Sequence, residues 1–168
     1  MNALPWYAPT RRPFQWALLL MLSLLTFGPY YAADTIAAIE TFLISGLGVS
    51  REVIGVMVAL YNVAAIFTVV AAGLVIDRIG AAQAGLLFAG LTALGTGLVA
   101  IKPVLWSIYT GRFLLGAGAE SLAVVQNVML ARWFARRELA LAFGVTLTCS
   151  RLGSLFTFNS APLLAQRH

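Results

Sequence analysis

The chain has 168 residues, of which 61% are hydrophobic and 10% are charged, whereas soluble globular proteins carry about 25% charged residues. A chain of this length cannot hide so much apolar surface in one core, so the composition excludes a soluble domain and makes lipid the expected solvent. The net charge of +5 does not indicate a nucleic-acid partner, because the basic residues lie singly or in short clusters between apolar runs.

Five apolar segments of the sequence are long enough to cross a membrane as helices, which takes about 20 residues. Backbone polar groups in hydrocarbon must bond within their own helix, so these segments predict an all-α, polytopic transmembrane bundle. We expect a cytoplasmic N-terminal segment over residues 1–13 and a helical bundle over 14–165. In chain order, the expected helices cover residues 14–39, 52–76, 81–101, 104–134 and 138–165.

Short connections with turn chemistry separate these helices. Ser50, which ends the run Ser45–Ser50, is the expected N-cap of the second helix. Asp77–Gly80 joins the second helix to the third, and Lys102–Pro103 breaks the third from the fourth. Ala135–Arg137 separates the fourth helix from the fifth.

The first helix is expected to be retained and the N-terminus to be cytoplasmic. Arg11 and Arg12 precede the first apolar run as in a signal peptide, but no small-residue cleavage site ends that run. Basic residues accumulate in cytoplasmic loops, and the side of the bundle where the first helix starts carries more of them. That side holds Arg11, Arg12, Arg78, Arg132, Arg136 and Arg137, and the other side holds Arg51, Lys102 and Arg167.

The number of helices suggests part of a larger carrier. Transporters are often built from three-helix repeats, so five helices indicate a six-helix half that lacks its last helix. We therefore expect a truncated end at 166–168 and a missing C-terminal half. A short internal sequence similarity agrees with such repeats, because Ala33–Ala38 in the first helix resembles Ala119–Val124 in the fourth.

Glu120 and Arg151 are the most informative pair of residues. Each lies near the middle of an apolar span, where an ionisable side chain costs about 2.5–3.5 kcal/mol on insertion scales. If the fourth and fifth helices form an antiparallel hairpin, both residues lie roughly 23 Å from its turn and share a depth. Two interpretations stay open: a permanent buried salt bridge, or a clamp in which Glu120 binds a substrate ammonium and Arg151 a carboxylate. Buried ion pairs stabilise poorly, which slightly favours the clamp.

Three further residues of the fourth span belong to the same helix motif. Arg112 lies about two turns from Glu120 on the same face. It either attracts anionic substrate groups or pairs with helix-end carbonyls, and we favour the structural role. Gly116 and Gly118 are small residues that permit close helix packing.

Other polar side chains within the spans are secondary candidates. Tyr30 and Asp34 lie toward the outer end of the first helix, beside Tyr31, where tyrosines suit the interface and Asp34 could gate the outer side. Asn127 is a candidate substrate contact. For the intramembrane amides as a group we favour interhelical hydrogen bonds over substrate contacts; they are Asn62, Gln126, Asn127 and Asn159. Tryptophans near the span ends, typical of an aromatic belt, are Trp6, Trp16, Trp106 and Trp133.

The sequence indicates neither an enzyme nor a metal or cofactor site. It contains no nucleophile–base arrangement, no internal histidine and no phosphate-binding loop. The single cysteine, Cys149, excludes a disulfide within the chain and reads as a packing residue, and His168 is the last residue.

Two stretches carry a resemblance to a known family. Gly73–Gly80 resembles the cytoplasmic loop signature Gly-x-x-x-Asp-Arg-x-Gly of the major facilitator superfamily, with Asp77 and Arg78 at the matching positions and Ala81–Gln83 where basic residues usually follow. Taken alone, this segment is also consistent with a plain capped loop. A longer stretch is similar to the branch of the superfamily that includes lysosomal dipeptide uniporters of animals and their prokaryotic relatives. Its matching parts are Phe27–Asp34, Gly111–Phe113, Gly116, Glu120–Val124, Gln126–Asn127, Trp133–Phe134, Glu138–Leu139, Phe143–Gly144 and Ser150–Ser154.

The resemblance implies one half of a twelve-helix carrier that moves dipeptides by alternating access, with about five helices present. It also implies that Glu120 and Arg151 bind the two peptide termini, which favours the clamp. The expected partners are a small-molecule substrate and the lipid bilayer. No strong N-terminal sorting signal is evident, so we expect a prokaryotic plasma membrane rather than a lysosome.

Two other functions stay open. The first is an organic-anion carrier of the same fold, coupled to protons, in which Arg151 is the anchor and Glu120 the proton site. The second is a membrane scaffold or receptor that transports nothing.

Overall fold

The computed structural model describes residues 12–101 and 104–165. Within these ranges it has six α-helices and no strands, which confirms the prediction of an all-α chain. The helices are α1 (Arg12–Ala38), α2 (Glu40–Leu47), α3 (Arg51–Ile79), α4 (Ala81–Ile101), α5 (Leu105–Trp133) and α6 (Arg136–Ala165). Some expectations concern residues outside the described ranges: the N-terminal segment up to Arg11, Trp6, Lys102–Pro103 and Gln166–His168.

Five of the described helices are long and apolar enough to cross a membrane, namely α1, α3, α4, α5 and α6. Large apolar side chains on their outer faces are exposed: Met21 is 71%, Phe67 73% and Leu86 77% exposed. So many exposed apolar side chains on long helices are unfavourable in water and favourable in lipid. The chain is therefore a multi-pass membrane protein.

The short helix α2 was not predicted from the sequence. The run Ser45–Ser50 was interpreted as a connection, but α2 extends through Leu47. It ends at Gly48, whose φ of 64° lies in the left-handed region that glycine adopts without strain. Ser50 then caps α3 as expected, because its Oγ accepts a hydrogen bond from the Val53 N–H at 3.4 Å.

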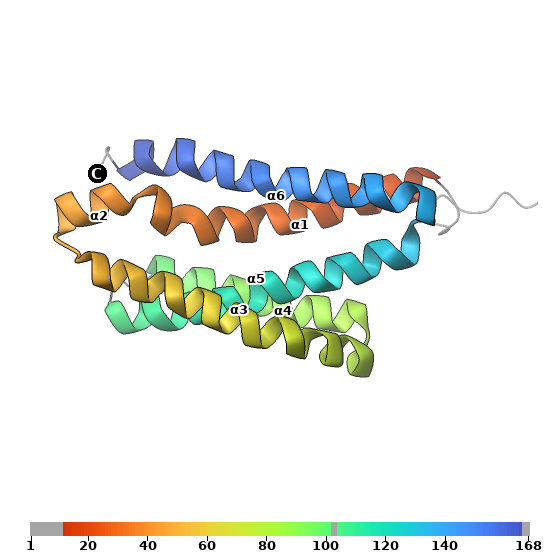
Figure 1. The fold of residues 1–168 in the computed structure, drawn as a ribbon, viewed down its shortest axis with the longest axis horizontal. Coiled ribbons are helices and arrows are strands. Elements are labelled where there is room, and N and C mark those ends of the chain that lie inside the picture. Colours follow the sequence, from red (N-terminus) through yellow and green to blue (C-terminus); the bar gives the residue numbers. More distant parts are fainter. Residues whose placement is uncertain (1–11, 102–103, 166–168) are drawn as a thin grey trace, which may run out of the picture.

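The helices form two groups that lie side by side (Figure 1). In one group, α6 runs along α1, and the Thr157 hydroxyl donates a hydrogen bond to Tyr31 O at 2.9 Å. Gly153 allows this approach, since a Cβ there would lie 2.6 Å from Phe27 O. In the other group, α5 packs on α3 and α4. A Cβ on Gly95 of α4 would lie 2.7 Å from Gly111 O of α5. Glycines therefore decide which helices touch.

The expectation that the fourth and fifth spans pack against each other as an antiparallel hairpin is wrong. Beside their connection α5 and α6 share a core cluster, in which Leu130, Phe134 and Ala142 meet Leu19 and Leu22 of α1. Farther along, α5 follows α3 and α4 while α6 follows α1. The glycine contacts hold each helix to its own group, so the two helices diverge from their connection.

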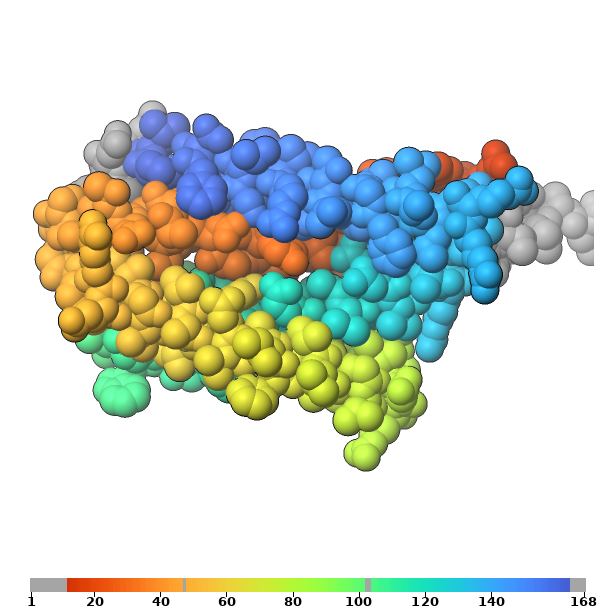
Figure 2. All heavy atoms as spheres, in the orientation of Figure 1, coloured from red at the N-terminus to blue at the C-terminus, as the bar shows by residue number. Residues whose placement is uncertain are grey.

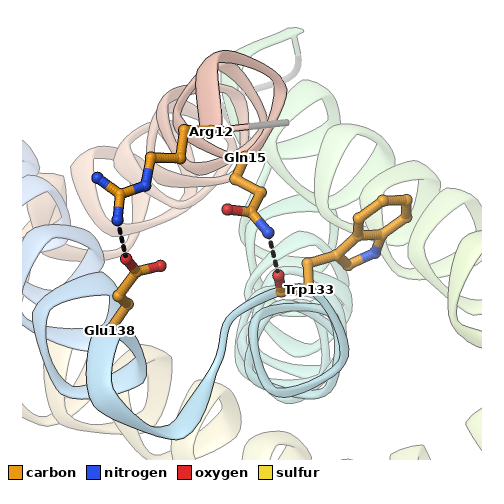
Figure 3. A network of polar contacts seen from close by, with 4 residues as sticks. All are labelled: Arg12, Gln15, Trp133 and Glu138. Atoms are coloured by element: carbon orange, nitrogen blue, oxygen red, sulfur yellow. Dashed lines mark hydrogen bonds and ion pairs between the residues drawn. The ribbon is translucent and has the colours of Figure 1, made fainter. Parts of the chain in front are cut away.

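Polar contacts join α1 to the connection between α5 and α6 (Figure 3). Gln15 Nε2 donates a hydrogen bond at 3.0 Å to the carbonyl of Trp133, the last residue of α5. This carbonyl has no partner within its own helix, so the side chain satisfies it. Arg12 and Glu138 form an exposed ion pair at 3.9 Å, which contributes little on its own.

Several turn residues lie inside helices rather than between them. Asp77 and Arg78 belong to the last turn of α3, so Asp77 does not cap α4. Gly80 makes this connection, with a φ of 84°. Gly73, the first residue of the loop signature, makes no close helix contact, because a Cβ there would meet nothing within 4 Å among the described residues. Arg136 begins α6 instead of preceding it.

Replacing Gly118 by alanine should destabilise the bundle by about 1–3 kcal/mol, because the added methyl group over-packs the contact of α5 with α4. Its Cβ would lie 2.6 Å from Thr92 N and 2.7 Å from Phe88 O. Gly90→Ala is the matched control, since nothing lies within 4 Å of a Cβ there. Thermal unfolding in detergent measures both variants, and equal melting temperatures would contradict this packing.

Candidate functional site

A cavity of about 200 Å³ lies between the two helix groups. Figure 2 shows the molecule hollowed between α1 and α3. The cavity is lined by residues of α1, α3, α5 and α6, among them six side chains singled out in the sequence: Tyr30, Asp34, Asn62, Arg112, Glu120 and Arg151. The charged and phenolic residues that line it are Tyr30, Asp34, Tyr61, Arg112, Glu120 and Arg151.

Two residues of α5, Arg112 and Glu120, line this cavity from one face of the helix. Arg112, Gly116 and Glu120 are spaced four residues apart, so they follow one another along the same helix face. All three contact Tyr61 of α3. The Arg112 guanidinium lies over the Tyr61 ring, with 5.1 Å between its central carbon and the ring centroid. A Cβ on Gly116 would overlap the Tyr61 carbonyl. The Tyr61 hydroxyl donates a hydrogen bond to Glu120 Oε1 at 2.8 Å.

Tyr61 is the site residue that sequence reasoning missed. Its position in the span could have identified it. Tyrosine usually anchors the ends of membrane spans, yet Tyr61 lies well inside α3 and next to Asn62. A phenol at such a depth needs a polar partner. Here the partner is Glu120, and a hydrogen bond to a charged group is worth about 1.5–3 kcal/mol.

Arg112 is a structural cation that joins three helices. It is only 3% exposed. Its Nη1 donates a hydrogen bond to Ala33 O of α1 at 2.8 Å, and its Nε donates to Met57 O of α3 at 3.4 Å. The carbonyls lie inside α1 and α3, not at helix ends as expected. These bonds occupy much of the guanidinium and fix it beside Tyr61.

Glu120 and Arg151 line the same cavity without pairing. No ion pair or hydrogen bond joins them within the described residues, so the structure does not contain the permanent salt bridge. Glu120 is half-buried and Arg151 is exposed. Their separation follows from the packing, because α5 belongs to one helix group and α6 to the other. The arrangement leaves an acid and a base from different helix groups in the lining of one cavity.

The remaining candidates fall in different places. Tyr30 and Asp34 line the cavity with Glu120. Asn127 does not; it lines a second cavity, of about 240 Å³, to which Tyr30 also contributes. Gln126 lines this second cavity as well.

Two of the amides bond within their own helices, and the loop motif lies away from the cavities. The expectation of interhelical hydrogen bonds is wrong for Asn62 and Asn159, since each donates to a carbonyl of its own helix, Val58 O and Leu155 O respectively. Asp77 and Arg78 are exposed at the end of α3, away from both cavities.

Comparisons with known proteins identify the chain's relatives. The model of the family described as Major Facilitator Superfamily matches residues 17–168. The chain is 31% identical over 155 residues to the lysosomal dipeptide transporter MFSD1 of Homo sapiens. The alignment covers 90% of this chain and 33% of that protein. The Mus musculus protein of the same name gives the same identity and coverage.

A bacterial relative is also similar. The inner membrane transport protein YajR of Escherichia coli strain K12 is 28% identical over 161 residues, covering 89% of this chain and 34% of that protein. The chain thus spans about a third of the length of the curated relatives it matches. No solved structure shows significant similarity to the chain.

Replacing Arg112 by lysine should lower the stability of the protein by about 1–3 kcal/mol, because an ammonium cannot bridge two carbonyls and stack on Tyr61 as the guanidinium fork does. The exposed Arg78→Lys is the control and should change stability by less than about 0.5 kcal/mol. Thermal unfolding in detergent distinguishes them, and an unchanged Arg112→Lys protein would refute the structural role.

Proposed function

The chain belongs to the major facilitator superfamily, and we propose that its cavity binds small zwitterionic solutes, dipeptides above all, for transport across the membrane by alternating access. The observation that carries the proposal is the unpaired acid and base that line one cavity, Glu120 and Arg151. A similarity of 31% to dipeptide transporters of animals supports the same substrate class.

In this proposal Glu120 takes the ammonium group of the substrate. Its Oε1 accepts the hydrogen bond from Tyr61, and carboxylate oxygens have further acceptor positions for a second donor. Tyr61 itself is held by the Arg112 guanidinium and by its contact with Gly116, so the carboxylate is oriented before the substrate arrives. Such preorganisation reduces the entropy lost on binding.

Arg151 takes the carboxylate group. Its guanidinium makes no hydrogen bond or ion pair within the part of the chain that the structure describes, so all of its donors are free. The planar fork of arginine matches a carboxylate with two parallel hydrogen bonds. A bound zwitterion would thus neutralise both charges at once, which offsets the cost of two unpaired charges at membrane depth.

The cavity would be completed by a second helical bundle. In carriers built from repeats, the substrate lies near the middle of the membrane at the interface between repeats. We propose that this chain supplies one side of that interface as part of a twelve-helix carrier, and that rocking of the two halves exposes the substrate to each side in turn.

The end of the bundle that begins α1 is proposed to face the cytoplasm. Arg12 lies there with Arg132 and Arg136, and Arg78 ends α3 at the same end in Figure 1. Arg51 begins α3 at the opposite end. Basic residues concentrate on the cytoplasmic side, and we propose a prokaryotic plasma membrane as the location.

Transport of organic anions is the second candidate. The free Arg151 guanidinium favours it, because an anchor for a carboxylate does not require an ammonium on the same solute. In that case Glu120 would carry a proton in place of an ammonium group.

Replacing Glu120 by glutamine should lower uptake of Ala-Ala at least tenfold while the protein still inserts in the membrane, because the amide cannot neutralise an ammonium. Uptake of radiolabelled Ala-Ala into proteoliposomes of the full-length gene product measures this. Glu52→Gln is the control, since Glu52 is exposed at the start of α3 and away from the cavity. Uptake of Ala-Ala at the wild-type rate by the Glu120 variant would reject the clamp. Efficient wild-type uptake of N-acetyl-Ala-Ala, which lacks the ammonium, would favour the organic-anion carrier.

Replacing Tyr61 by phenylalanine should raise the KM for Ala-Ala roughly three- to tenfold with little change in maximal rate, because one hydrogen bond that orients Glu120 is lost. The ring remains for Arg112, so folding should be preserved. Tyr109→Phe removes a phenol of α5 outside the cavity and should leave KM unchanged. Equal KM values for the wild type and the Tyr61 variant would show that the hydroxyl does not act on the substrate.

A further inference from the structure

The second cavity differs from the first in its chemistry. Its volume is about 240 Å³, and apart from Tyr30 no titratable side chain lines it. Amides and hydroxyls from α1, α5 and α6 line it instead, beside a few apolar groups. The polar residues other than Tyr30 are Thr26, Gln126, Asn127, Thr146 and Ser150.

Gln126 supplies an unused hydrogen-bond donor. Its side chain is only 4% exposed, and its Nε2 has no partner among the described residues. A buried amide nitrogen without an acceptor destabilises the folded protein. Buried polar groups in native proteins are nearly always satisfied, and Gln126 lines the cavity, so its amide is the group there that an acceptor on a ligand would satisfy.

The hydroxyls of the cavity supply unused acceptors. Thr26 donates its single hydrogen to Ser23 O at 3.0 Å, and Ser150 donates to Leu147 O at 2.8 Å. Thr146 donates to carbonyls of its own helix as well, at 3.0 and 3.1 Å. Each hydroxyl oxygen keeps lone pairs for another donor. The cavity therefore offers both donors, among them Gln126 Nε2, and several acceptors, which suits a primary amide that also carries both.

The two cavities are close enough to be reached by one substrate. Tyr30 lines both. On α6, Ser150 lines the second cavity and the next residue, Arg151, lines the first. On α5, Gln126 lies six residues from Glu120, about 9 Å along the helix. The backbone of a dipeptide spans about 7 Å, so its termini can stay in the first cavity while a side chain extends into the second.

We propose that the second cavity is a side-chain subsite that prefers a carboxamide, so that dipeptides containing glutamine or asparagine are favoured substrates. This inference rests on the proposed function, because it assigns the peptide termini to Glu120 and Arg151. Gln126 donates to the carboxamide oxygen, and the hydroxyl oxygens accept from its nitrogen. A carboxylate of the same shape is disfavoured, since no cation lines the cavity to compensate for its burial.

Uptake of Ala-Gln, Gln-Ala, Ala-Glu and Ala-Ala into proteoliposomes of the full-length gene product tests the subsite. Wild-type protein should transport one of the two glutamine peptides about tenfold better than Ala-Glu, judged by kcat/KM. Gln126→Leu should lower kcat/KM for that preferred peptide about five- to tenfold, because one hydrogen bond is lost. The same variant should leave kcat/KM for Ala-Ala within twofold of the wild-type value. Folding should be retained, since leucine removes a buried donor that has no partner. Thr146→Val, which removes an acceptor, should act in the same direction.

Asn159→Leu is the matched control: this exposed amide of α6 bonds to its own helix and lies outside both cavities. If Ala-Ala is transported and Gln126→Leu lowers kcat/KM equally for all four peptides, or for none of them, the subsite is refuted while the proposed function stands. If the wild type transports no dipeptide, the proposed function and the subsite fail together.

Discussion

The contact of Tyr61 with one face of α5 is the constraint on which the cavity depends. Arg112, Gly116 and Glu120 follow one another at four-residue spacing, and each holds a different part of Tyr61: ring, backbone and hydroxyl. Only glycine at the middle position lets the α3 backbone come close enough for the hydroxyl to reach Glu120. A packing contact thus determines where a carboxylate points, and this link connects the helix interface with the proposed substrate chemistry.

Glycine contacts also keep the acid and the base apart. Gly153 holds α6 on α1, while Gly95, Gly111, Gly116 and Gly118 hold α3, α4 and α5 together. Since Glu120 belongs to one helix group and Arg151 to the other, the two side chains face a common cavity without bonding to each other. Two unpaired charges at membrane depth are costly. A zwitterionic ligand removes this cost more completely than a ligand of one charge, which is why we propose dipeptides rather than simple anions as substrates.

The sequence predicted the helical bundle, because five long apolar segments leave few alternatives in lipid. It also placed Glu120 and Arg151 together, since charges within apolar spans are conspicuous. It failed where chain order and spatial order differ. The expected hairpin was inferred from a short connection, but close glycine contacts between other helix pairs override it. Tyr61 was missed because tyrosine is ordinary in membrane proteins, and its significance comes from a partner that lies 59 residues away in the chain. The short helix α2 was missed because Ser45 and Gly46 suggest a turn, whereas the turn requires only the positive φ of Gly48.

A structure of the full-length gene product with bound Ala-Ala would show whether the cavity holds the two peptide termini. We expect density for the peptide in the cavity, with its ammonium group within hydrogen-bond distance of Glu120, its carboxylate on Arg151, and Tyr61 still bonded to Glu120. A structure in which Glu120 and Arg151 bond to each other while the peptide lies elsewhere would contradict this expectation.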